Sequence, residues 1–405
     1  MARTRYHANW ILPITSPPIE GGWVDVEDGV IAALGQDSDL CDATSIRDVQ
    51  LGSYVILPGL VNAHTHLELS GLQGLVSQSE SMPIWARDVM QNSAIHRTDN
   101  AKSMQHAVVE MRSAGTSLVG DITNTLDSVR VLDEGAVDAV VFHEMLGFDV
   151  SEDEVPDLLA RTVLLASERI EHRVSIRLAA HAPYSVSREL FRGLLTALPG
   201  PRAVHLAESP EEIDFLKNGS GVWKEILQER GRWNSEWGTP GIGAVDYLNK
   251  LGWLEPDTLV VHGVQLTGYE MKQLASAGVN LVTCPRSNMW TGAGEPPINE
   301  FYESGLRVAI GTDSLASVSD LNLFNELIEV RRLAPKVSAR DILTSATLTG
   351  ASALGRAETY GSIEPQKRGA LIGVALLGHT SDVEEYLLSG IESKQVVWLE
   401  DLDVG

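Results

Sequence analysis

The chain has 405 residues, of which 43% are apolar and 21% charged, a composition typical of a globular protein with a full hydrophobic core. It carries 55 acidic and 31 basic residues, a formal net charge of −24, which makes nucleic acids and anionic membranes unfavourable partners. Its two cysteines, Cys41 and Cys284, are too few for a disulfide framework or a four-cysteine zinc site.

Both ends of the chain have the pattern of short strands and turns. Residues 1–20 are interrupted by prolines and predict neither a secretory signal nor a membrane span, so we expect a cytoplasmic protein. Alternating apolar and polar positions continue to residue 57, and similar segments recur from about Tyr360, among them residues 386–391. We therefore predict one small β domain formed by residues 1–57 and 358–405.

The central residues 58–357 alternate short β-branched runs with helical segments. Eight runs are predicted strands, at residues 59–66, 116–123, 136–145, 174–183, 202–209, 257–264, 279–285 and 306–314. Predicted helices separate several of them, at residues 104–115, 156–170 and 187–198. This alternation predicts a parallel α/β sheet, open or closed, and the length suits a (β/α)8 TIM barrel, which needs about 250 residues.

Polar, ligand-capable residues end nearly all of these predicted strands. They are His64, His66, Asp121, His143, His181, His205, His262 and Asp313, and they include six of the 11 histidines in the chain. In a parallel barrel the carboxyl ends of the strands meet at one mouth, where active sites lie. The pattern therefore predicts a site built from strand ends.

His64 and His66 have the i, i+2 spacing that places two imidazoles on the same face of a strand, where they can bind one cation. A surface pair is the alternative interpretation.

His205 is followed three residues later by Glu208. Hydrolytic metal chemistry needs this combination, because the metal lowers the pKa of its water and a nearby carboxylate moves the proton. The alternative for this pair is a core histidine beside a helix-capping glutamate.

Asp313 follows the apolar run 308–311, where it could complete a ligand set of three histidines and one aspartate or simply cap the next helix. His262 could polarise the substrate, hydrogen-bond the water or bind a second metal. Two-metal sites of this kind need an anionic bridge, commonly a modified lysine, and no lysine occurs between Lys102 and Lys217. We therefore expect one divalent ion, with Zn²⁺ preferred and Fe²⁺ as the alternative.

Six segments in this order and spacing resemble the deaminase and chlorohydrolase branch of the amidohydrolase superfamily: PGLVNAHTHLELSG, HAPYS, HLAES, VHG, CPRSN and GTDS. The resemblance implies a distorted (β/α)8 barrel with a β-sandwich built from both termini. It also implies metal ligands at His64, His66, His205 and Asp313, a proton-shuttling Glu208, a polarising His262 and a substrate-facing His181.

Within that branch, HTHLELS, HAPYSVS and HLAESPEEIDFL look most like aminodeoxyfutalosine deaminases. The resemblance implies hydrolytic deamination of a purine nucleoside-like small molecule by an enzyme that could be a homo-oligomer. S-Adenosylhomocysteine, guanine or cytosine deamination, or triazine dechlorination, is the alternative activity, and a non-catalytic barrel is a further one. Glu68, Trp85 and Tyr184 are candidate substrate contacts, although a solvated glutamate and a packed tryptophan are alternatives for the first two.

Overall fold

The computed structural model describes residues 3–39, 47–95, 100–169, 172–378 and 380–404. Cys41 lies outside these residues. Eight parallel strands follow one another around a barrel in chain order: β5 (Leu60–Thr65), β6 (Thr116–Thr123), β7 (Asp138–Met145), β8 (Val174–Ala180), β9 (Arg202–Leu206), β10 (Thr258–His262), β11 (Asn280–Thr283) and β12 (Arg307–Ile310). All eight predicted strands are therefore confirmed, and so is the predicted (β/α)8 barrel.

The first and last strands close the barrel through a short seam rather than a regular ladder. The backbone N–H groups of Thr312 and Asp313 both donate to the carbonyl of His64, each at 3.1 Å. Asn62 reinforces the seam, because its side chain donates to Thr312 Oγ1 at 2.8 Å. Gly311 permits this approach, since a Cβ there would lie 2.7 Å from the carbonyl oxygen of His64. The seam brings Asp313 beside the first strand.

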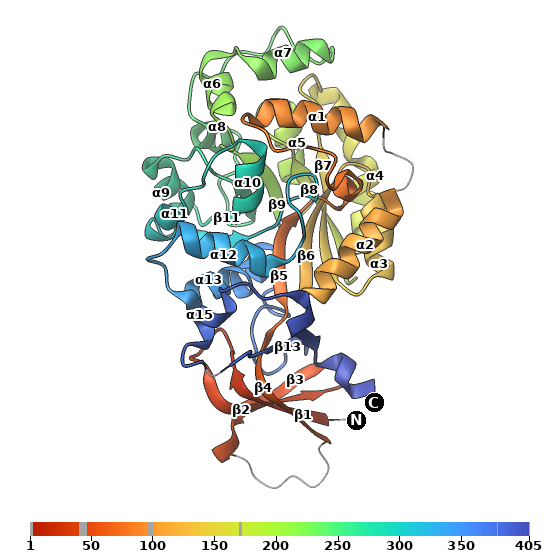
Figure 1. Ribbon diagram of the computed structural model, residues 1–405. Coiled ribbons are helices and arrows are strands. Elements are labelled where there is room, and N and C mark those ends of the chain that lie inside the picture. The colour runs from red at the N-terminus through yellow and green to blue at the C-terminus, as the bar shows by residue number, and fades with distance from the viewer. Residues whose placement is uncertain (1–2, 40–46, 96–99, 170–171, 379, 405) are drawn as a thin grey trace.

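Helices surround the barrel between successive strands (Figure 1). They are α1 (Met82–Ile95), α2 (Asn100–Ser113), α3 (Asp127–Glu134), α4 (Val155–Ser167), α5 (Arg188–Ala197), α6 (Pro210–Asn218), α7 (Val222–Glu229), α8 (Ala244–Lys250), α9 (Gly268–Ser276), α10 (Pro285–Thr291), α11 (Ile298–Glu303), α12 (Leu323–Leu333), α13 (Ala339–Ser345) and α14 (Leu348–Ala353). The three predicted helices correspond to α2, α4 and α5. None of the described helices is long and apolar enough to cross a membrane.

Both ends of the chain contribute to a separate six-stranded sheet with the order β14-β13-β4-β1-β2-β3. Its strands are β1 (Arg3–Ile11), β2 (Ile19–Glu27), β3 (Val30–Gln36), β4 (Arg47–Pro58), β13 (Leu371–Ala375) and β14 (Val396–Trp398). The sheet confirms the predicted β domain from both termini, for which we propose the limits 1–57 and 358–405. No strand forms at residues 386–391, where that prediction was wrong. Asp382 instead caps helix α15 (Val383–Leu387) by accepting the N–H of Glu385.

The terminal sheet contacts the barrel at the end where the strands begin. Trp398 of β14 donates its indole N–H to the carbonyl of Arg112 at 2.7 Å, and the guanidinium of Arg112 lies over the same ring. Gly115, just before β6, packs against Ile372 of β13. Helices α6 and α7 lie at the other end of the molecule (Figure 1). The mouth at the carboxyl ends of the strands therefore faces away from the terminal sheet.

Candidate metal centre and active site

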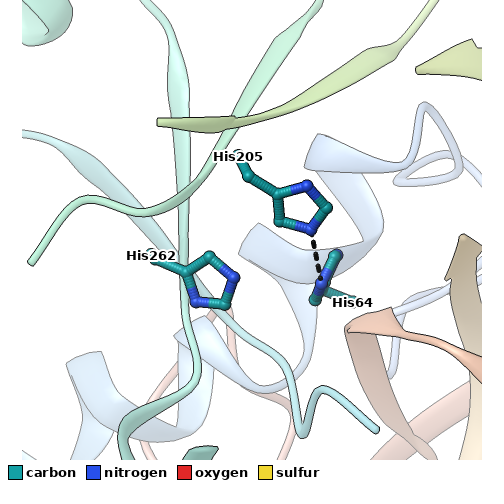
Figure 2. Close-up of side chains that lie close together, drawn as sticks. All are labelled: His64, His205 and His262. Atoms are coloured by element: carbon teal, nitrogen blue, oxygen red, sulfur yellow. Dashed lines mark hydrogen bonds between the residues drawn. The ribbon is translucent and has the colours of Figure 1, made fainter. Parts of the chain in front are cut away.

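Four side chains that the sequence predicts as metal ligands converge inside the mouth of the barrel. The Nε2 atoms of His64 and His205 are 3.4 Å apart, and Asp313 Oδ1 lies 3.9 Å from Nε2 of His64 and 3.7 Å from Nε2 of His66. Figure 2 shows the side chains of His64, His205 and His262 close together, with a ring nitrogen of His205 directed at His64. The four predicted ligands come from strand β5 and the residue just after it, from strand β9 and from the turn after β12.

Hydrogen bonds outside the cluster determine which ligand atoms remain free. The Nδ1 of His205 lies 2.9 Å from the carbonyl oxygen of His181, which leaves Nε2 without its hydrogen and directed at His64. Ser287 Oγ donates to Oδ2 of Asp313 at 2.6 Å, which leaves Oδ1 facing the histidines. Both residues therefore offer one acceptor atom to the centre of the cluster.

Burial keeps the imidazoles of the cluster in their neutral form. Desolvation lowers the pKa of His64 well below its ordinary value and lowers that of His66 as well. It lowers the pKa of His205 to about 4, despite the opposing charge of Glu144. Neutral imidazole is the form that binds a metal ion. The donor set of three nitrogens and one carboxylate fits Zn²⁺, which prefers these ligands at a site with an open position.

Three non-glycine residues of the site have positive φ angles: Ala207 at 51°, His262 at 76° and Asp313 at 61°. This backbone region is rare for residues with a Cβ, and each such residue costs about 1–3 kcal/mol. All three lie at or just beyond the carboxyl ends of barrel strands. Strained residues that gather at one mouth indicate that the backbone is bent there to direct side chains inward.

Glu208 and His262 face one another beside the four-residue cluster. Glu208 Oε1 is 3.6 Å from Nε2 of His262, and their side chains are 5% and 2% exposed. Desolvation raises the pKa of Glu208 well above its ordinary value, with Asp313 and Glu212 adding to the effect. The same burial lowers the pKa of His262. Burial therefore favours the protonated form of Glu208 and the neutral form of His262.

A cavity of about 910 Å³ opens above the cluster, within the size range of sites for small organic ligands. Predicted site residues that line it are His66, Glu68, Trp85, His181, Tyr184, His205, Glu208, His262 and Asp313. His64 lies beneath this surface. Apolar and aromatic side chains form most of the wall, so the cavity suits a flat, largely apolar molecule held by a few polar groups.

The predicted substrate contacts differ in the freedom of their polar atoms. Glu68 accepts the N–H groups of Asn124 at 2.9 Å and Thr125 at 3.0 Å, so its carboxylate also holds the turn after β6. Within the part of the chain that the structure describes, the hydroxyl of Tyr184 and the indole N–H of Trp85 are buried without a partner. Both residues line the cavity, although the two polar atoms themselves are buried.

Two strand-end residues of the sequence pattern do not join the cavity. Asp121 accepts the backbone N–H of Leu67, and His143 contacts Thr162 Oγ1 at 2.6 Å on the outer side of the barrel. Successive residues of a strand point to opposite faces, so Glu144 points inward where His143 points outward. Its Oε1 lies 3.4 Å from Nδ1 of His205. The sequence pattern marked His143 at this strand end and did not mark Glu144.

Other residues of the site were not among the predicted site residues. Trp223 of α7 lines the cavity and stacks on Tyr184 with their ring centroids 3.9 Å apart. Asn288 and Ser287 stand in the CPRSN segment, and they contact His262 and Asp313. Their place in that segment was visible, but their partners lie 26 residues away and only the fold joins them.

Comparison with known proteins gives matches over most of the chain. The profile described as the amidohydrolase family matches residues 55–398. The aminodeoxyfutalosine deaminase of Deinococcus radiodurans is 30% identical over 354 residues, covering 82% of this chain and 81% of that protein. The structure of Helicobacter pylori aminofutalosine deaminase with methylthio-coformycin superimposes with a TM-score of 0.86 at 26% identity, covering 97% of this chain and 100% of the other. An adenosine deaminase from Xanthomonas campestris with bound zinc gives 0.82 at 26% identity, covering 98% and 90%.

Proposed function

The chain belongs to the amidohydrolase family, and we propose that it is a zinc-dependent hydrolase that deaminates the purine ring of an adenosine-type nucleoside. It is a hydrolase acting on carbon–nitrogen bonds, as its family and its deaminase relatives indicate. One observation supports the proposal most strongly. The cluster of histidines with Asp313 and the Glu208–His262 pair lie together at the bottom of one cavity.

His64, His66, His205 and Asp313 would hold the ion. When bound, a divalent ion supplies Lewis-acid activation of water, which yields a nucleophile near neutral pH. Zinc is favoured over iron because the donor set matches it and because a similar adenosine deaminase contains bound zinc. We propose one ion per chain.

Glu208 begins the reaction as the general acid. Burial raises its pKa and so favours the protonated carboxyl group, whose proton goes to a ring nitrogen of the substrate. The ring carbon that bears the amino group becomes more electrophilic and accepts the oxygen of water. Asp313 takes the first proton that the water loses. Glu208, now a carboxylate, takes the remaining proton of the new hydroxyl group and passes it to the departing ammonia. The C–N bond breaks and a carbonyl group replaces the amine.

His262 stabilises the tetrahedral centre. Its Nδ1 lies 2.9 Å from the side-chain amide of Asn288, which donates to it and so leaves the ring hydrogen on Nε2. Nε2 faces Glu208 and the cavity, where its N–H can donate to the oxygen that develops negative charge. His181 also lines the cavity, and its Nδ1 contacts Ser185 Oγ at 2.6 Å, so its other nitrogen is available to the substrate.

The cavity favours a nucleoside over a free base. Its volume of about 910 Å³ exceeds the space that a single heterocycle fills, and Trp85, Tyr184 and Trp223 line it with aromatic surface. Glu68 could accept hydroxyl donors of a sugar. Aminodeoxyfutalosine is the first substrate to test, because one similar protein is named an aminodeoxyfutalosine deaminase and a similar structure an aminofutalosine deaminase. Adenosine is the second candidate, since the zinc-containing neighbour is an adenosine deaminase.

Ammonia release from the zinc-loaded protein tests the proposal. The panel contains aminodeoxyfutalosine, adenosine, S-adenosylhomocysteine, guanine, cytosine and a chlorinated triazine. We expect a purine nucleoside to give the highest kcat/KM. Among the purine nucleosides we expect aminodeoxyfutalosine to give the highest value. Turnover confined to a free base or to chloride release would contradict the substrate class, and no release from any amine would contradict the deaminase function. Inductively coupled plasma analysis of the same sample measures zinc and iron independently of activity.

A further inference from the structure

Glu208 follows a bend in the backbone that is held from both sides. Ala207 has a φ of 51°, and its carbonyl accepts the N–H of Gln265 at 2.7 Å. A non-glycine residue in this conformation persists only where the surroundings determine it. The bend turns the chain out of β9, so that Glu208 leaves the strand direction and faces His262.

The other side of the bend is held by the carboxylate of Glu212. Its Oε1 accepts the N–H of Ala207 at 2.9 Å, and its Oε2 accepts the N–H of Glu208 at 3.0 Å. Glu212 lies in the first turn of α6 and is 0% exposed. The Glu212 side chain therefore accepts two consecutive buried backbone N–H groups. One belongs to the strained Ala207 and the other to Glu208, the proposed acid.

Helix capping does not account for this arrangement. Ser209 already caps α6, because its hydroxyl accepts the N–H of Glu212. Glu154 offers a contrast, since it forms a capping box with Ser151 just before α4 from an exposed position. A glutamate that only caps a helix can stay in water, whereas Glu212 is buried and makes no ion pair with any basic residue in the described ranges. Its desolvation raises its pKa to about 7.

We propose that Glu212 is a positioning residue, whose carboxylate fixes the Ala207–Glu208 backbone so that the carboxyl group of Glu208 stays beside His262. This inference rests on the proposed function of Glu208 as the proton-transferring group. Glu212 does not contact the substrate and is absent from the residues that line the cavity. Its effect on the reaction passes through Glu208.

Glu212→Gln tests the proposal. Glutamine keeps one acceptor oxygen but presents an NH2 group to the second backbone N–H, so the bend loses one of its two bonds. We expect kcat to fall about 10- to 100-fold, as it does when an acid is displaced by about 1 Å, while KM and zinc content stay within about twofold. Glu154→Gln is the matched control and should leave kcat unchanged. Unchanged kcat in Glu212→Gln would overturn the proposal.

A double-mutant cycle separates positioning from general loss of structure. In a Glu208→Gln background, Glu212→Gln should reduce the residual turnover no further, because the group that it positions has gone. A second decrease of the same size would show that Glu212 acts elsewhere and would overturn the proposal. Should Glu212→Gln fail to fold, Ala207→Gly/Glu212→Gln replaces it, because glycine adopts a φ of 51° without this support.

Crystal structures of the zinc-bound wild type and Glu212→Gln give a readout that needs no turnover. We expect the 207–209 backbone and the carboxyl group of Glu208 to move away from His262. An unmoved Glu208 would overturn the positioning role even where the protein is an active deaminase. A displaced Glu208 in a protein without deaminase activity would instead contradict only the proposed function.

Discussion

Nδ1 of His262 lies 2.9 Å from the side-chain amide of Asn288, and both side chains are buried, 2% and 0% exposed. The contact joins the end of β10 to helix α10. It determines which ring nitrogen carries the hydrogen, and it holds the ring where its Nε2 faces Glu208.

Asn288→Ala should reduce kcat by about 10-fold or more, because His262 loses the donor that fixes its tautomer and orientation. Steady-state kinetics checks the expectation. The zinc content should not change, because Asn288 contacts none of the four proposed ligands through a side-chain hydrogen bond between described residues. Asn299→Ala on α11 is the control, since it also removes an amide hydrogen bond but lies outside the cavity wall. Equal kcat values in the two variants would contradict the role given to Asn288.

Glu208→Gln should lower kcat by about 10²- to 10⁴-fold, because glutamine has nearly the same shape but cannot transfer a proton. Elemental analysis should find the wild-type zinc content, since Glu208 is not among the proposed ligands. The exposed Glu300→Gln variant on α11 controls for the loss of one negative charge. Full turnover by Glu208→Gln would eliminate this residue as the acid.

Removal of the ion by a chelator should abolish turnover and lower the Tm. An ion held by the four proposed ligands would join β5, β9 and the turn after β12, and an ion present at about 100 times its Kd stabilises the folded state by about 2.7 kcal/mol. Added Zn²⁺ should restore both properties, with one ion bound per chain in an elemental titration. A His64→Asn variant should show the low Tm with or without zinc. Full activity of the chelated protein would rule out a metal-dependent reaction.

Asp121→Asn should change how stability depends on pH. Burial raises the pKa of Asp121 from 3.8 to about 7, so the folded state retains a proton that the unfolded chain releases. The free energy of unfolding of the wild type should therefore decrease as the pH rises from about 4 to about 7, by an amount on the order of 4 kcal/mol from this group. Asparagine keeps an oxygen for the N–H of Leu67 and does not titrate.

Thermal unfolding at both ends of that pH range measures this effect. The Tm of Asp121→Asn relative to the wild type should rise with pH, and the difference should level off above about pH 7. Asp153→Asn, at an exposed position, should follow the wild type throughout. Parallel curves for Asp121→Asn and the wild type would contradict the raised pKa.

The sequence alone determined the barrel and most of its mouth. Nearly every strand is a short β-branched run that ends in a polar residue, and the period of a strand assigns His64 and His66 to one face. The parallel order then requires these ends to meet. The sequence pattern was misleading where the two faces of a strand alternate. It placed His143 at the mouth of the barrel, whereas the neighbouring Glu144 lines the cavity.

Tertiary structure decided the contacts between residues that are distant in the chain. Only closure of the barrel at the β5–β12 seam brings Asp313 within 3.9 Å of His64. Only the folded positions of α7 and α10 show that Trp223 lines the cavity and that Asn288 orients His262. The strained bend at Ala207 and its support by Glu212 likewise have no signature in composition or period. Residue type and spacing determine which groups can do the chemistry, but distance and burial determine which nitrogen or oxygen is free to do it.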